Sequence, residues 1–186
     1  MSEPTTSTDV IRVMIVDDHP LVREGLSGLI NKQADMEVCG EVEDAETALR
    51  VIGSVQPDVA IVDISLKEGS GIELIKDISI RFPGVKSVVS SMHAEELFAE
   101  RALQAGALGY VHKQQGSSQI LEAIRRVLGG GIYLSEKSSQ RVLSRITQGR
   151  DDSAASPLST LSDREMQVFE MLGHGRGTRE IAVARH

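Results

Sequence analysis

The sequence is poor in the residues that stabilise secreted proteins, stack on flat cofactors or span membranes. It has no tryptophan, 3% aromatic residues and a single cysteine, Cys39, which we interpret as part of a strand core. One cysteine cannot form an internal disulfide, so we expect a reducing compartment, the cytoplasm. No apolar run approaches the roughly 20 residues that a membrane span needs, so we expect no membrane partner. The polar start MSEPTTSTD is unlike a signal peptide, and we expect residues 1–9 to be a disordered tail.

Composition otherwise suits a globular protein with one domain and a smaller additional piece. The chain has 186 residues, of which 40% are hydrophobic and 25% are charged. Its formal net charge is −7. This charge argues against nucleic-acid binding by the chain as a whole, although a small reading head remains compatible with it.

Two short apolar stretches end in carboxylates. The stretch Val59 to Val62 stops at Asp63, and a turn rich in glycine and serine follows. The stretch 11–16, IRVMIV, stops at Asp17 and Asp18. Runs of this length and composition predict strands buried on both faces, which belong to parallel sheets covered by helices. Functional groups gather outside the carboxyl ends of such strands, so the three acids mark a candidate site.

Three carboxylates in one shallow cleft repel one another unless they share a proton or hold a cation. Oxygen ligands, without histidine or cysteine at ligand spacing, favour Mg²⁺. A carboxylate beside Mg²⁺ can also attack phosphorus and form an aspartyl phosphate. The pattern therefore indicates a candidate cation site formed by Asp17, Asp18 and Asp63, at which a carboxylate can also act as a nucleophile toward phosphorus.

Strand and helix patterns alternate along the chain in five repeats. This alternation predicts a doubly wound α/β sheet. The expected strands are 11–16, 36–42, 58–62, 85–90 and 107–112, and the expected helices are 20–33, 44–55, 70–82, 94–105 and 117–129.

Four motifs then occur in order: VDDHP at 16–20, Asp63 with GSG at 69–71, SSMH at 90–93 and GYVHK at 109–113. Together they resemble the receiver domain of bacterial two-component response regulators over about residues 10–131, most closely the NarL/FixJ subfamily. The resemblance implies a flavodoxin-like (CheY-like) five-stranded parallel sheet of order 2-1-3-4-5. It also implies a regulatory phosphoacceptor rather than an enzyme, with slow autophosphotransfer and autodephosphorylation only.

The resemblance assigns roles to individual residues. A sensor histidine kinase would phosphorylate Asp63 in a Mg²⁺-dependent reaction, and Lys113 would pair with Asp63 or with a phosphoryl oxygen. Ser91 would be the switch hydroxyl, and Tyr110 the switch aromatic. The metal ligands would be Asp17, Asp18, Asp63 and the backbone carbonyl of Ser65.

A few positions depart from the receiver pattern. Lys67 stands where many receivers have proline, and Gln114 follows the lysine where many have a cis-proline. Ser90 puts a hydroxyl where an apolar strand residue is usual, which leaves two serines as candidates for the switch. His19 and His93 border the cleft without metal-ligand spacing, and we interpret them as rim residues.

The remaining residues resemble a linker and the start of a LuxR-type helix-turn-helix. Residues 132–160 predict a short helix over 135–146 and a polar linker. In residues 161–186, Ser162 and Glu165 form a capping box, and a Gly-His-Gly turn separates two helical patterns. The recognition helix that would follow is missing from this sequence. Arginines and acidic residues are equal in number over residues 162–186, so this segment offers no basic patch. We therefore expect promoter DNA to bind only an untruncated form, and residues after about 149 to be loosely ordered or to rest on the receiver.

Two other classes stay open on the sequence alone. An Asp-nucleophile Mg²⁺ phosphohydrolase would want a second acid two residues after the nucleophile, where this chain has Ser65. A degenerate receiver would act as an interaction module without phosphorylation. Exposed helix surfaces of the receiver would also allow a homodimer.

Overall fold

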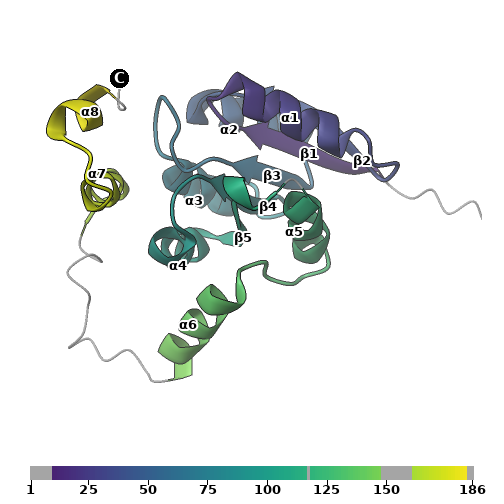
Figure 1. The fold of residues 1–186 in the computed structure, drawn as a ribbon. Coiled ribbons are helices and arrows are strands. Elements are labelled where there is room, and N and C mark those ends of the chain that lie inside the picture. Colours follow the sequence, from purple (N-terminus) through teal and green to yellow (C-terminus); the bar gives the residue numbers. More distant parts are fainter. Residues whose placement is uncertain (1–9, 117, 148–160, 184–186) are drawn as a thin grey trace, which may run out of the picture.

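The sheet expected from the sequence is present. A computed structural model describes residues 10–116, 118–147 and 161–183; the expected tail 1–9 and most of the expected linker lie outside these ranges. All paired strands run parallel, in the order β2-β1-β3-β4-β5 (Figure 1). The strands are β1 (Ile11–Val16), β2 (Met36–Val42), β3 (Val59–Val62), β4 (Lys86–Ser91) and β5 (Ala107–His112). The doubly wound prediction and its strand order are thus confirmed.

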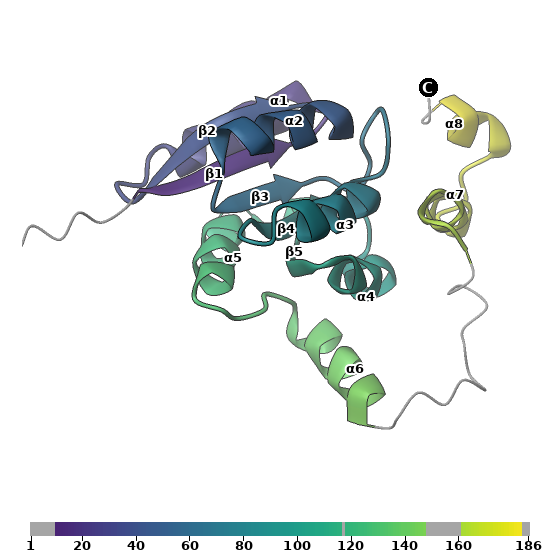
Figure 2. The same cartoon turned by 180° about the vertical axis from the view of Figure 1, so that it is seen from behind.

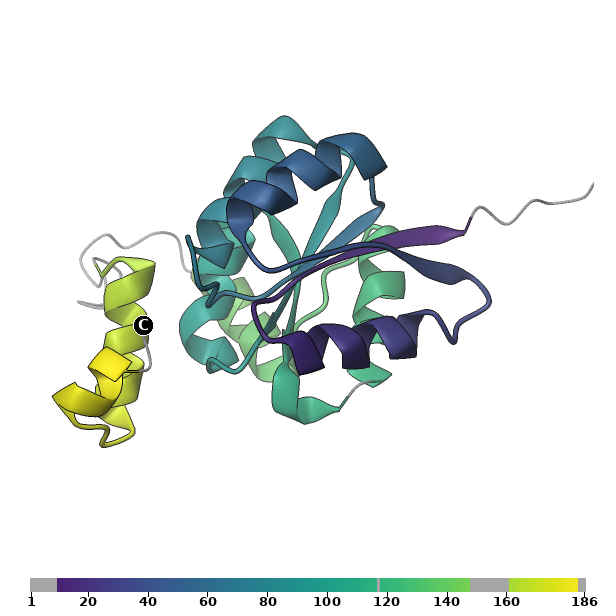
Figure 3. The same cartoon turned by 90° about the horizontal axis from the view of Figure 1, so that it is seen from above.

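Helices cover both faces of the sheet, as the all-buried strand β3 requires. One apolar layer contains residues of α2 (Ala45–Val55), α3 (Gly71–Arg81) and α4 (Glu95–Ala105). The other contains residues of α1 (Pro20–Ile30) and α5 (Ser118–Leu128). Figures 2 and 3 show the sheet between these two layers from behind and from above.

The first helix is shorter than the sequence pattern suggests. The prediction extended it to residue 33, but α1 ends at Ile30. The Asn31 side-chain oxygen accepts a hydrogen bond from the backbone N–H of Val38 at 2.8 Å. This bond turns the chain toward β2, because an asparagine side chain offers the backbone an alternative to the helical ladder.

The chain after α5 covers the edge of the sheet at β5. The backbone N–H of Tyr110 donates to the carbonyl of Tyr133 at 2.8 Å, and the N–H of Tyr133 donates to the carbonyl of Leu108 at 2.9 Å. This pairing protects an edge that would otherwise present free backbone groups. A 3-10 turn, η1 (Lys113–Gln115), lies between β5 and α5.

Three helices follow. The short helix expected near 135–146 is α6 (Glu136–Thr147), and Lys137 pairs with Glu96 of α4 at 2.9 Å. Beyond it, α7 (Asp163–Gly173) begins with the predicted capping box, and α8 (Thr178–Val183) follows a turn. Within the described part of the chain, every helix is too short or too polar to cross a bilayer.

Candidate functional site

The site lies where β1, β3 and β5 end. The register of β1 and β3 sets Val16 opposite Val62, so the next residue on each strand, Asp17 and Asp63, reaches the same edge. Gly71 allows the following loop to close on this edge, because a Cβ at position 71 would lie 1.9 Å from the Asp63 carbonyl oxygen. No other residue has room there.

Lys113 joins the two buried carboxylates. Its Nζ lies 2.7 Å from Asp17 Oδ2 and 2.7 Å from Asp63 Oδ2. Asp18 is more open, and His19 Nδ1 lies 2.7 Å from Asp18 Oδ1. The structure therefore brings together the three acids and the lysine that the sequence singled out.

Burial disfavours the charged forms of the side chains in this cluster. Asp63 is only 3% exposed. Loss of water raises the pKa of its carboxyl, although the neighbouring Lys113 ammonium opposes this shift. For Lys113 burial favours the neutral form, but the carboxylates of Asp63 and Asp17 outweigh it and raise the lysine pKa. The lysine thus remains charged, and the acids would gain from a further cation.

The donor set fits a hard metal ion. Ligand atoms of Asp17, Asp18, His19 and Asp63 all lie within 4.8 Å of one another. Among the described residues, the buried oxygens Asp17 Oδ2 and Asp18 Oδ1 lack a hydrogen bond and have only ion-pair contacts with Lys113 and His19. Carboxylate oxygens are the ligands that Mg²⁺ prefers in proteins. The acidic pocket can therefore hold such an ion.

Ser91, Tyr110 and His93 form a hydrogen-bonded group beside the acids. Ser91 is fully buried at the end of β4, and its Oγ accepts from the backbone N–H of His93 at 3.3 Å. The buried Tyr110 hydroxyl donates to the carbonyl of His93 at 2.9 Å. Burial also raises the pKa of Tyr110, so its hydroxyl stays protonated. The loop that carries His93 is thus tied to both candidate switch residues.

The two adjacent serines of β4 are on opposite faces of the sheet. Side chains alternate along a strand. Val89 packs in the layer that contains Tyr110, and Val88 packs in the other layer. Ser91 therefore shares a face with Tyr110, whereas the buried Ser90 points to the face covered by α1 and α5. The geometry favours Ser91 over Ser90 as the switch candidate.

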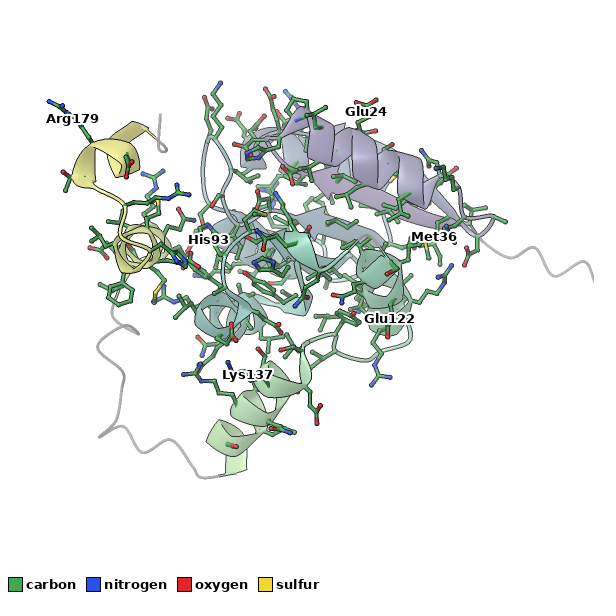
Figure 4. All side chains as sticks on the ribbon, viewed as in Figure 1. Glu24, Met36, His93, Glu122, Lys137 and Arg179 are labelled. Atoms are coloured by element: carbon green, nitrogen blue, oxygen red, sulfur yellow. The ribbon has the colours of Figure 1, made fainter. Side chains whose placement is uncertain are left out.

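Sequence reasoning missed the residues that α7 adds to this edge. Glu170 contacts the His93 side chain through one oxygen and accepts from the backbone N–H of Ala94 at 2.9 Å through the other. His93 also contacts Ser65, with 2.6 Å between His93 Nε2 and Ser65 Oγ. Figure 4 shows His93 on the side of the sheet that faces α7. No local pattern signals these contacts, because 77 positions separate Glu170 from His93.

A parallel 2-1-3-4-5 sheet, with buried acids at the ends of β1 and β3 and a lysine after β5, defines the class of receiver domains. The response regulator receiver domain matches residues 13–125. The chain therefore belongs to the response regulators, regulatory proteins of two-component systems that phosphorylation controls.

Relatives in sequence and in structure are regulators of the NarL and LuxR type. The oxygen regulatory protein NreC of Staphylococcus carnosus is 33% identical over 92% of this chain and 81% of its own length. The response regulator GacA of Pseudomonas aeruginosa is 31% identical over 93% of this chain and 80% of its own. A solved LuxR-family regulator from Aurantimonas is 33% identical, with a TM-score of 0.68 over 73% of this chain and 97% of its own.

Proposed function

We propose that Asp63 is the phosphoacceptor of this response regulator. A carboxylate oxygen of Asp63 attacks phosphorus, and the bond to the donor's leaving group breaks with its electron pair. The position of Asp63 at the end of β3, 2.7 Å from the Lys113 ammonium, is the observation that carries this proposal. Lys113 then balances negative charge that arrives with the phosphoryl group.

The ion we propose for the acidic pocket is Mg²⁺. Asp17, Asp18 and Asp63 would hold it with their carboxylates, and the backbone carbonyl of Ser65 would add a further ligand. When bound, the metal neutralises charge on the transferring phosphoryl group. The clustering of the carboxylate oxygens of Asp17, Asp18 and Asp63 at one edge of the sheet supports this assignment.

The proposed switch starts with Ser91. Its hydroxyl bonds a phosphoryl oxygen on Asp63, and Tyr110 follows behind it. Both residues already contact the loop at His93, which leads directly into α4. One added phosphoryl group would thus bias α4, β5 and α5 between two arrangements.

The proposed division of the chain is a receiver over 10–131, a short helix and linker over 132–160, and a partial LuxR-type helix-turn-helix over 161–186. The protein acts in the cytoplasm, a sensor histidine kinase is the phosphodonor, and autophosphotransfer and autodephosphorylation are slow. Solved structures of the relative RcsB include dimers bound to DNA, at 26% identity over 95% of this chain. The corresponding role here is control of transcription. A form of the protein with a complete helix-turn-helix would bind promoter DNA as a dimer.

Intact mass after incubation with acetyl phosphate and Mg²⁺ tests the proposal. We expect one phosphoryl adduct that requires Mg²⁺, disappears in Asp63→Asn and persists in Asp58→Asn. Asp58 is the matched control, because this carboxylate precedes β3 at the opposite edge of the sheet and accepts from the N–H of Arg12. An adduct that survives Asp63→Asn, or a folded wild type without any adduct, would refute the assignment.

A further inference from the structure

The segment that leads into α6 contacts the receiver at two elements. Tyr133 pairs with the backbone of β5, and its carbonyl accepts from the N–H of Tyr110 at 2.8 Å. Two residues further on, the N–H of Ser135 donates to Oε1 of Glu95, in the first turn of α4, at 2.8 Å. The Ser135 hydroxyl in turn accepts from the N–H of Ser138 at 3.2 Å, as an N-cap side chain does. Helix α6 therefore begins at the residue that Glu95 holds.

Glu95 makes the strongest of the contacts between α4 and the start of α6. Glu95 is only 6% exposed, and a hydrogen bond to a buried carboxylate is charge-assisted. Lys137, which lies between α6 and α4 in Figure 4, pairs with Glu96, but its side chain is 77% exposed, so water screens this pair. The exposed Arg141 donates to the backbone carbonyl of Glu96 at 3.2 Å. The packed position of α6 thus depends chiefly on Glu95.

The same helix buries a polar group that opposes this position. Ser138 is only 3% exposed, and within the described part of the chain its Oγ has no hydrogen-bond partner. Burial of such a hydroxyl is unfavourable, because water would bond it if the helix moved away. One charge-assisted bond therefore favours the packed position of α6, and one unsatisfied hydroxyl opposes it. A small change at the first turn of α4 can shift such a balance between two positions.

Glu95 follows closely on the loop that carries the candidate switch contacts. Ser91 Oγ accepts from the N–H of His93, and the Tyr110 hydroxyl donates to the carbonyl of His93. Helix α4 begins with Glu95 two residues later. When Ser91 turns toward a phosphoryl group and Tyr110 follows it, both bonds to His93 break, and the first turn of α4 is free to shift. The second contact of the α6 segment is affected as well, because Tyr133 is bonded to Tyr110 itself.

We propose that Glu95 couples the occupancy of Asp63 to the position of α6. While Asp63 is free, Glu95 holds Ser135 and α6 packs on α4. A phosphoryl group on Asp63 shifts the first turn of α4, the bond to Ser135 breaks, and α6 leaves. The inference rests on Asp63 as phosphoacceptor and Ser91 as switch, and it adds the buried carboxylate that passes the change to the next helix. Because coupling is reciprocal, the packed α6 lowers the affinity of the site for a phosphoryl mimic by the same factor.

The test is hydrogen exchange of the α6 amides on the full chain, with and without beryllium trifluoride and Mg²⁺. Beryllium trifluoride binds a carboxylate as a phosphoryl group does, and ¹⁹F NMR counts the bound fluoride. In the wild type, exchange over residues 136–147 should become about tenfold faster when the mimic binds, as the loss of one charge-assisted bond predicts. Asp63→Asn should bind no fluoride and show no change.

Three variants at the contact should act in a graded order. Glu95→Ala removes the acceptor, so α6 should exchange about five- to tenfold faster without the mimic, and the affinity for the mimic should rise by a similar factor. Glu95→Gln keeps an acceptor oxygen and should lie between Glu95→Ala and the wild type. Ser138→Ala removes the unsatisfied hydroxyl, so it should slow exchange about threefold and weaken the mimic's binding in proportion.

The matched control is Glu73→Ala, which removes the same charge from the first turn of α3 and should match the wild type. An equal acceleration in Glu73→Ala would reduce the effect to charge at a helix start and would overturn the proposal. Bound fluoride with unchanged exchange in α6 would also overturn it, while the phosphoacceptor would stand. A folded wild type that binds no fluoride would refute the phosphoacceptor and the coupling together. Circular dichroism checks the fold, and if Glu95→Ala unfolds, Glu95→Gln and Ser138→Ala must still shift exchange in opposite directions.

Discussion

The receiver and α7 are held in place by different forces. In the receiver, large side chains such as Ile75, Phe98 and Ile124 are fully buried in two apolar layers. Helix α7 buries Met166 and Gln167, while Phe169 remains 44% exposed. It contacts the receiver through Met166, which belongs to the apolar layer of α2, α3 and α4, and through the carboxylates of Asp163 and Glu170, which pair with receiver side chains.

This contrast implies that the receiver can stay folded whether or not α7 lies against the site. Apolar burial contributes about 25 cal/mol per Å² of buried surface, so the receiver has a large reserve of stability. Ion pairs near the surface contribute much less, so α7 can leave while the receiver stays folded. Elements that complete a binding site are commonly drawn from this weakly held end of a molecule.

The largest effect is expected from a cavity in the receiver core. Ile75→Ala should lower the free energy of unfolding by about 3 kcal/mol, because a buried methyl-rich side chain is lost and its space stays empty. Urea unfolding measures the change. Met166→Ala removes a similar volume from α7 and should leave the receiver's midpoint where it is. An equal loss in both variants would show that α7 belongs to the cooperative core.

A smaller effect is expected from Lys113, where charge matters inside the receiver itself. Lys113→Gln leaves Asp17 and Asp63 facing each other without their cation, which should cost about 2 kcal/mol at pH 7. The exposed Lys76 on α3 is the control, and Lys76→Gln should change stability little. Added Mg²⁺ should restore part of the loss, as denaturation with and without the metal would reveal.

The pH dependence of Lys113→Gln follows from Asp63. Its pKa in the fold lies above the ordinary value of 3.8, and without Lys113 it lies higher still. Above pH 3.8 the folded state then binds a proton that the unfolded state has released, so stability falls as the pH rises through this window. The deficit of Lys113→Gln should therefore be smaller at pH 5 than at pH 7. A deficit that grows toward pH 5 would contradict the assignment.

The features that the sequence predicted are those written locally. An apolar run followed by Asp63, or by Asp17 and Asp18, marks both a buried strand and its functional end. The start of α7 was likewise evident, because a capping box needs only Ser162 and Glu165. Because the carboxyl ends of neighbouring parallel strands lie at the same edge of the sheet, the acids then come together.

The features that it did not predict depend on groups far apart in the chain. Asn31 ends α1 through Val38, and Tyr133 pairs with the edge of β5, although neither position stands out in the sequence. The anchors of α7 are more distant still, since Asp163 and Arg101 are 62 positions apart. In the sequence, a helical acid that faces solvent cannot be distinguished from one, such as Asp163, that pairs with a distant guanidinium.

The smallest effect is expected at the anchor of α7 itself. Arg101→Gln removes the partner of Asp163 and should weaken the seating of α7 by about 1 kcal/mol or less. Hydrogen exchange of residues 163–173 should then be up to about fivefold faster. Arg125→Gln is the matched control, since it breaks an ion pair with Asp35 in the receiver, 3.3 Å long, that does not involve α7.

Salt offers a second way to test the same anchor. Between 0.1 M and 1 M salt the screening length falls from about 10 Å to about 3 Å, which weakens pairs that water can reach. Exchange in α7 should therefore quicken with salt, while amides of β1 and β3 keep their protection. If neither salt nor Arg101→Gln affects α7 but Met166→Ala does, one buried side chain outweighs both carboxylates. Helix α7 would then be held as the receiver core is, by apolar burial.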